Sequence, residues 1–193
     1  KQLKKDVFSD GEKNPFKKII DFDNVGVMGH SMGGGTTYVG LLKDQNIKAG
    51  IAFDGWFFGL LDKEAVTNTR KPFLHIGQEQ FLNDNIPGDI NDSEEGKRNF
   101  VIYQKMLKNN KESYGVYIKE SLHYTFTDLK LIYRQGAPLS LPLKNLGPVD
   151  KKIVDNVMDT MVLDFFNYSL KNKQFDFSAY DTYGGKVIYK QHP

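Results

Sequence analysis

The stretch Asp23–Thr36, DNVGVMGHSMGGGT, places one serine among glycines, directly after closely spaced apolar residues. The apolar residues predict a buried strand over 25–29, and the residues after the serine predict a helix over 32–43. Gly29–Gly33 fits G-x-S-x-G, in which a sharp strand-to-helix turn exposes the hydroxyl of Ser31. Because side chains two positions either way would collide at such a turn, we expect glycine to be required at positions 29 and 33. The stretch predicts a nucleophilic serine.

The same turn should arrange the groups around the serine. The Met32 amide, at a helix N-terminus, would point toward a developing oxyanion. Gly34 and Gly35 would let the helix pack close to the sheet. The alternative is a glycine-rich, phosphate-binding turn, but the lysine of the G-x-x-x-x-G-K-[ST] pattern is absent.

The rest of the sequence alternates short apolar runs with longer amphipathic segments, as in an α/β protein with a mostly parallel sheet. Further strands are predicted over 48–53, 72–77 and 114–119. Further helices are predicted over 94–109, 124–133 and 150–170. With 193 residues, the chain is long enough for one domain, which we place at 1–177. Residues 178–193 form a C-terminal extension in which we predict no regular element.

Composition excludes several function classes. The net charge is +2, and the 26 basic residues include only three arginines, so no basic stripe indicates a nucleic-acid partner. Without cysteine there is no thiolate nucleophile and no disulfide. No apolar run is long enough to span a bilayer, and the first residues lack the apolar core of a signal peptide. We expect a soluble chain, and its compartment stays undetermined.

Four histidines are candidates for the base that a serine nucleophile needs. His30 adjoins the serine and points away from the turn, and His192 is next to the C-terminus. His75 lies inside a predicted strand, as a core histidine does. His123 follows the strand over 114–119 and precedes a predicted helix. We therefore expect His123 to be the base, with a helix-capping surface histidine as the alternative.

An acid must orient that base. Asp54 ends the strand after the Ser31 helix, so its carboxylate should emerge at the same edge of the sheet. Ionised and accepting the imidazole proton, it would hold the tautomer that attack requires. Glu79 and Asp84 follow the next strand and are alternative acids, in which case Asp54 would only cap a turn.

Aromatic residues surround these candidates in the sequence. We expect a substrate pocket lined by His30, Trp56, Phe57 and Tyr124. The block Trp56-Phe57-Phe58 could instead touch a lipid surface or belong to the core under the sheet.

Four ordered blocks give the chain a resemblance to a known family: residues 29–34 (GHSMGG), 50–58 (GIAFDGWFF), 72–77 (PFLHIG) and 121–128 (SLHYTFTD). Over about residues 21–170, the chain resembles the platelet-activating-factor acetylhydrolase family. This resemblance implies an α/β-hydrolase fold and cleavage of short or oxidised sn-2 acyl groups from phospholipids without calcium. It implies Ser31 as nucleophile, Asp54 as acid, His123 as base and Met32 as oxyanion donor. A serine mechanism of this kind needs no metal or organic cofactor.

Three departures from that family carry consequences. The segment between Asp54 and His123 is longer than in the animal enzymes, and Tyr124 stands where they have glutamine, which bears on substrate selectivity. Only about two dozen residues precede Val25, whereas about four strands and an oxyanion loop precede the nucleophile strand in this fold. The chain therefore corresponds to the C-terminal half of a hydrolase, and we expect an N-terminal half as its partner.

Two other functions stay open. A broad esterase or cutinase-like polyester hydrolase shares G-H-S-M-G-G-G and carries its acid after the strand equivalent to 72–77. A hydrolase fold that has lost activity could serve as a binding or scaffold protein, although Ser31, Asp54 and His123 are all present.

Overall fold

Five strands form one sheet whose spatial order follows the sequence, β1-β2-β3-β4-β5. The computed structural model describes residues 19–82, 92–129 and 146–192. The first four strands are parallel, and the last is antiparallel to its neighbour. Their bounds are β1 Val25–His30, β2 Ile47–Phe53, β3 Phe73–Gln78, β4 Ser113–Ile118 and β5 Val187–His192. The chain therefore has the expected α/β fold with a mostly parallel sheet.

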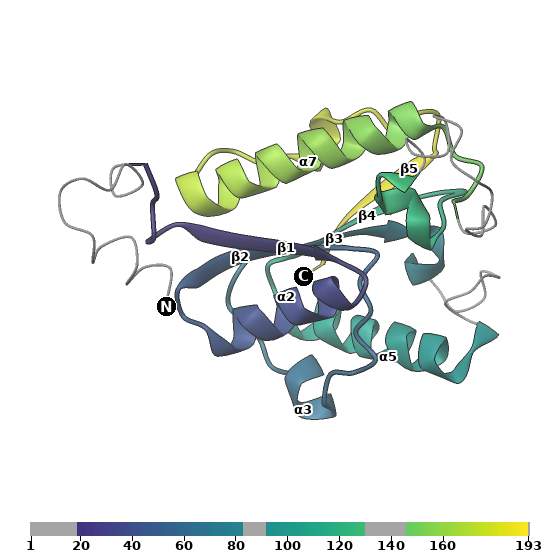
Figure 1. The fold of residues 1–193 in the computed structure, drawn as a ribbon. Coiled ribbons are helices and arrows are strands. Elements are labelled where there is room, and N and C mark those ends of the chain that lie inside the picture. Colours follow the sequence, from purple (N-terminus) through teal and green to yellow (C-terminus); the bar gives the residue numbers. More distant parts are fainter. Residues whose placement is uncertain (1–18, 83–91, 130–145, 193) are drawn as a thin grey trace.

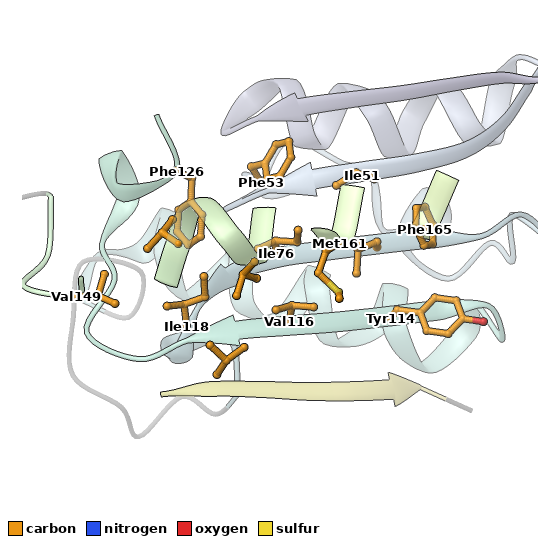
Figure 2. Packing of buried hydrophobic residues seen from close by; sticks show 14 of the residues in the cluster. Ile51, Phe53, Ile76, Tyr114, Val116, Ile118, Phe126, Val149, Met161 and Phe165 are labelled. Carbon is orange, nitrogen blue, oxygen red and sulfur yellow. The ribbon is translucent and has the colours of Figure 1, made fainter. Parts of the chain in front are cut away.

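Helices cover both faces of this sheet (Figure 1). One face packs against α7 (Lys151–Lys171), and the other against α2 (Met32–Lys43) and α5 (Glu94–Asn109). Figure 2 shows the α7 side, where strand residues meet Met161 and Phe165. Parallel strands buried on both faces need apolar residues on both sides, which explains their nearly continuous apolar runs.

The short elements complete the described chain. They are α3 Asp62–Ala65 and the 3₁₀ turns η3 Glu79–Leu82, η4 His123–Phe126 and η6 Phe177–Ala179. None of the helices in the described ranges is long and apolar enough to cross a membrane.

Apart from the short α3, which was not predicted, the strand and helix predictions agree with the structure to within one residue at each end, with two exceptions. The predicted helix over 124–133 is wrong at its start, where the chain forms η4 and then extends at Thr127. The Thr125 hydroxyl, which accepts from the Leu122 amide at 2.8 Å and also donates to the Leu146 carbonyl, holds this tight turn. Residues 130–133 of that prediction lie outside the described residues.

The second exception is β5, since no element was predicted after residue 177. A turn at Tyr183, Gly184 and Gly185, all with positive φ, reverses the chain into this strand. Only Val187 of β5 is fully buried, so the strand carries little hydrophobic periodicity. It pairs with β4 from Val187, opposite Ile118, to His192, opposite Ser113.

The other edge of the sheet is β1. Within the described residues this strand pairs only with β2, and its Met28 side chain is 59% exposed. A groove of about 600 Å³ lies between β1 and α7, with apolar residues of both elements in its walls. Unpaired strand edges invite pairing with a further strand.

Candidate active site

Ser31 occupies a strained turn between β1 and α2. Its backbone lies at φ 59° and ψ −123°, a combination that L-residues with a Cβ seldom adopt. The Ser31 amide donates to the Phe53 carbonyl at 3.0 Å, and the Trp56 amide donates to the Ser31 carbonyl at 2.8 Å. The end of β2 and the loop after it therefore hold the turn in place.

The glycines around this turn are not equivalent. A Cβ on Gly29 would lie 2.5 Å from the backbone of Gly33, which confirms that position 29 requires glycine. Outside its own helix backbone, a Cβ on Gly33 would meet no atom of the described residues within 4 Å, so the expectation that this position also requires glycine is wrong. Gly34 and Gly35 do bring α2 close to the sheet, since a Cβ on Gly35 would lie 2.3 Å from the Trp56 carbonyl oxygen.

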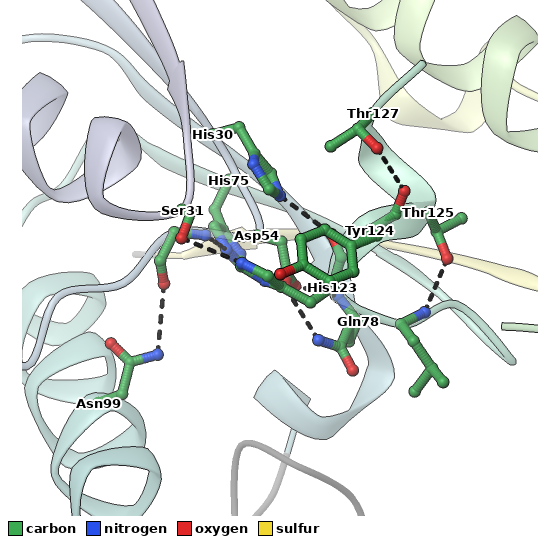
Figure 3. A network of polar contacts seen from close by, with 12 residues as sticks. His30, Ser31, Asp54, His75, Gln78, Asn99, His123, Tyr124, Thr125 and Thr127 are labelled. Carbon is green, nitrogen blue, oxygen red and sulfur yellow. Dashed lines mark hydrogen bonds and ion pairs between the residues drawn. The ribbon is translucent and has the colours of Figure 1, made fainter. Parts of the chain in front are cut away.

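Three side chains from three strand ends form one hydrogen-bonded series (Figure 3). Ser31 Oγ lies 3.0 Å from His123 Nε2, and His123 Nδ1 lies 2.6 Å from Asp54 Oδ2. Because the carboxylate can only accept, Nδ1 carries a proton and Nε2 is left to accept from the hydroxyl. Although Ser31 is the N-cap of α2, its side chain makes no capping bond and faces the imidazole.

The backbone amide of Met32 begins α2. Among the described residues no acceptor for this N–H is found, as is usual for the first amides of a helix. It lies next in the chain to Ser31 at the positive end of the helix dipole, where an anion is stabilised.

Asp54 is fully buried and is held by β3. Its backbone has φ 43°, and its amide donates to the Ile76 carbonyl at 2.8 Å. Gln78 donates twice to the carboxylate, from its backbone amide to Oδ1 at 3.1 Å and from Nε2 to Oδ2 at 2.8 Å. Gln78 was not predicted, because its only signal in the sequence is a polar residue at the end of an apolar strand.

Two more buried groups fix the loop after Asp54. His75 Nε2 accepts from the Gly55 amide at 3.2 Å, and burial lowers the pKa of His75 to about 3. His75 is therefore a neutral core histidine, as expected. Asn99 on α5 accepts from the Phe57 amide and donates to the Gly55 carbonyl at 3.3 Å. Asn99 was not predicted either.

The aromatic residues expected in a pocket separate into two groups. The rings of His30, Trp56 and Tyr124 lie 4.6, 5.4 and 5.4 Å from the His123 ring. Phe57 instead is fully buried and stacks on Tyr103 in the core beneath the sheet, so it does not line a pocket.

His30 has a further contact that the sequence did not indicate. Its Nε2 donates to the backbone carbonyl of His123 at 3.0 Å, which joins the nucleophile turn to the histidine loop. Burial lowers the pKa of His30, which favours the neutral ring. The neutral ring can still carry the single proton on Nε2 that this hydrogen bond needs.

Of the alternative acids, only Glu79 lies in the described residues, and no contact of it with His123 is found there. A carboxylate oxygen of Glu79 accepts from the Glu120 amide at 3.3 Å, and Asp84 lies outside the described residues. His192 has a different partner, with its Nε2 3.3 Å from the Tyr117 hydroxyl. Across the described ranges, no group of three or more histidine and carboxylate side chains is placed to hold a metal ion.

The fold defines the class of the protein. A ferulic acid esterase from Streptomyces cinnamoneus has a similar structure, with a TM-score of 0.71 and 21% identity over 97% of this chain and 52% of the esterase chain. The sheet order, the covering helices and this likeness define an α/β-hydrolase fold.

Within that class, residues 3–185 match the family model of platelet-activating factor acetylhydrolase, isoform II, and the chain belongs to this family. The platelet-activating factor acetylhydrolase of Gallus gallus is 26% identical over 90% of this chain and 37% of its own length. That of Bos taurus is 26% identical over 86% of this chain and 34% of its own length. The chain thus spans about a third of the length of these relatives.

Proposed function

We propose that this chain carries the nucleophile, base and acid of a serine esterase that removes short or oxidised sn-2 acyl groups from phospholipids. The observation that supports this proposal most directly is the continuous series from Asp54 through His123 to Ser31. Membership of the acetylhydrolase family supports the choice of substrate.

In the proposed reaction, Ser31 Oγ attacks the ester carbonyl while His123 Nε2 takes the hydroxyl proton. The Asp54 carboxylate stabilises the imidazolium that forms, and the Met32 amide donates to the oxyanion of the tetrahedral intermediate. His123 then protonates the departing lysophospholipid oxygen as the acyl-enzyme forms. Water, deprotonated by the same imidazole, attacks the acyl-enzyme, and release of the carboxylic acid restores Ser31.

A pocket next to Ser31 suits a short acyl chain. It holds about 290 Å³ between α2 and the loop after Asp54 and is lined by Met32, Val39, Trp56, Phe58 and Leu60, with three small residues. Met32 and Trp56, which line it, are 70% and 39% exposed, and we expect them to contact the lipid surface that holds the substrate.

We also propose that complete activity requires an N-terminal half that pairs with the open edge of β1. The exposed Met28 side chain and the apolar groove against α7 support this arrangement. In enzymes of this fold a loop before the nucleophile strand supplies the second oxyanion amide. Loss of one such donor lowers turnover by about 100-fold to 1000-fold.

The direct test is labelling of the full-length protein with a fluorophosphonate, followed by peptide mapping and by turnover of phospholipids whose sn-2 acyl chain lengthens from acetyl. We expect an adduct on Ser31, no turnover by Ser31→Ala, and turnover that falls as the chain lengthens. Unchanged turnover by Ser31→Ala would contradict the assigned nucleophile. Equal turnover of simple aryl esters and short-chain phospholipids would point instead to a broad esterase, and binding of phospholipid without release of fatty acid would point to an inactive scaffold.

A further inference from the structure

The Asp54 carboxylate needs support that His123 alone does not provide. Its side chain has no exposed surface, and an ionised carboxylate withdrawn from water is unstable unless donors replace the lost hydration. Three donors reach it among the described residues: His123 Nδ1, the Gln78 amide and Gln78 Nε2. Two of the three belong to one residue.

The two Gln78 donors hold different oxygens. The backbone amide reaches Oδ1 at 3.1 Å, and Nε2 reaches Oδ2 at 2.8 Å. Oδ2 is also the atom that faces His123 Nδ1 at 2.6 Å. Contacts on both oxygens stop the carboxylate from rotating about its Cβ–Cγ bond, so the oxygen that meets the imidazole keeps its direction (Figure 3).

The surrounding residues leave little room for the Gln78 and Asp54 side chains to move apart. Gln78 is itself fully buried at the end of β3. At Gly77 a Cβ would lie 2.4 Å from the His75 ring and 3.3 Å from Asp54 Oδ1, so the ring and the carboxylate fill the space that a side chain would need. Gln78 Oε1 has no partner among the described residues, so the side-chain hydrogen bond of Gln78 is the one from Nε2 to Asp54.

An amide suits this position better than a carboxylate. The amide NH₂ group donates to the ionised Asp54 without carrying charge and does not compete for the imidazole proton. A glutamate would place a second negative charge beside the first, which favours its protonated form.

We infer that Gln78 is a positioning residue of the proposed esterase: it holds Asp54 in the orientation that keeps His123 ready to take the Ser31 proton. This inference rests on the proposed function. Gln78 touches neither the substrate nor Ser31 and acts only through Asp54.

The test compares Gln78→Leu and Gln78→Glu in the full-length protein, with Gln104→Leu as the matched control. Gln104 Nε2 donates to the Phe81 carbonyl at 3.1 Å, so this control loses an amide donor away from the site. We expect Gln78→Leu to lower kcat by about 10-fold to 100-fold with little change in KM, because substrate contacts are kept while the base is misdirected. Gln104→Leu should keep both constants.

Gln78→Glu gives a signature that a packing defect would not. When protonated, the introduced carboxyl group donates one hydrogen bond to Asp54, and when ionised it repels the Asp54 carboxylate. The turnover of this variant relative to the unmodified protein should therefore rise as the pH falls, while the ratio for Gln78→Leu stays flat. The readout is how the ratio of variant to unmodified turnover changes with pH. A loss of folded protein that is the same at every pH lowers this ratio but does not make it change with pH.

A second measurement does not depend on turnover. The proton on His123 Nδ1 should give a downfield NMR resonance that Gln78→Leu shifts or broadens and Gln104→Leu leaves in place. Three results would overturn the positioning role. They are a wild-type kcat in both Gln78 variants, a ratio of Gln78→Glu to unmodified turnover that does not change with pH, and an unchanged resonance in Gln78→Leu. Failure of the proposed function would instead appear as unchanged turnover by Ser31→Ala.

Discussion

At the scale of single residues, the strained backbone of Ser31 links stability to activity. A residue with a Cβ in such a conformation stores about 1–3 kcal/mol, whereas the extra unfolded-state entropy of glycine costs about 0.5–1 kcal/mol. The strain energy therefore exceeds the entropic cost of glycine. We therefore expect Ser31→Gly to be about 1 kcal/mol more stable to unfolding than Ser31→Ala, as measured by urea denaturation. Both variants lose the hydroxyl, so neither should hydrolyse esters, and equal stability would show that the turn is unstrained.

The buried His75 predicts a dependence of stability on pH. Its pKa is about 3 in the folded protein and about 6.5 when unfolded, so the unfolded chain binds the proton first as the pH falls. The contribution of neutral His75 to the free energy of unfolding is complete above pH 6.5 and is lost progressively toward pH 3. The loss reaches about 2.5 kcal/mol at pH 4.5.

His75→Gln keeps an acceptor for the Gly55 amide but does not titrate. Its free energy of unfolding should therefore fall less steeply than that of the unmodified protein between about pH 6.5 and 4.5. Parallel curves in calorimetric or denaturant unfolding would contradict the assigned protonation of His75.

At the scale of elements, α2 offers a matched pair of glycines. A Cβ on Gly35 would overlap the Trp56 carbonyl oxygen, so Gly35→Ala should force the helix away from the loop and destabilise the fold by about 1–3 kcal/mol. Outside its own helix backbone, a Cβ on Gly33 meets no described atom within 4 Å, and alanine is the better helix former. Gly33→Ala should therefore stabilise by about 0.5–1 kcal/mol. Thermal unfolding of the two variants checks both signs.

The elements that sequence reasoning predicted are those with strong periodicity. Strand 48–53 is apolar on both faces and helix 94–109 presents a regular stripe, so burial alone predicts them. The apolar run over 25–29 also predicted its strand, although no residue of β1 is fully buried among the described residues. β5 was missed because it lies at an edge and buries little. The helix predicted over 124–133 is wrong at η4 because the local sequence pattern does not reveal the contact of Thr125 with Leu146, which is distant in sequence.

The candidate site likewise contains residues that the sequence predicted and residues that it did not. Ser31 was predicted from G-x-S-x-G, and the strand ends together with the family resemblance selected Asp54 and His123. In the structure His123 lies within hydrogen-bond distance of both Ser31 and Asp54. Gln78 and Asn99 were not predicted, because which side chain supports a buried carboxylate or loop depends on packing between elements.

At the scale of the whole molecule, the open edge of β1 predicts a difference in hydrogen exchange. Alternate N–H groups of this strand point away from β2 and lack a partner strand among the described residues. If an N-terminal half pairs there, these amides should exchange about 100-fold or more slowly in the full-length protein than in residues 1–193 alone. Amides facing β2 provide the internal control, and fast exchange of the outward amides in the full-length protein would exclude that pairing.

The reversed direction of β5 has a practical consequence for handling the protein. Ser31, Asp54 and His123 follow the carboxyl ends of parallel strands, whereas His192 lies opposite Ser113, at the amino end of β4. A linker fused after this strand would leave from the end of the sheet remote from the nucleophile. Immobilisation on a bead or sensor surface through that linker should keep the edge that carries Ser31 facing the solution.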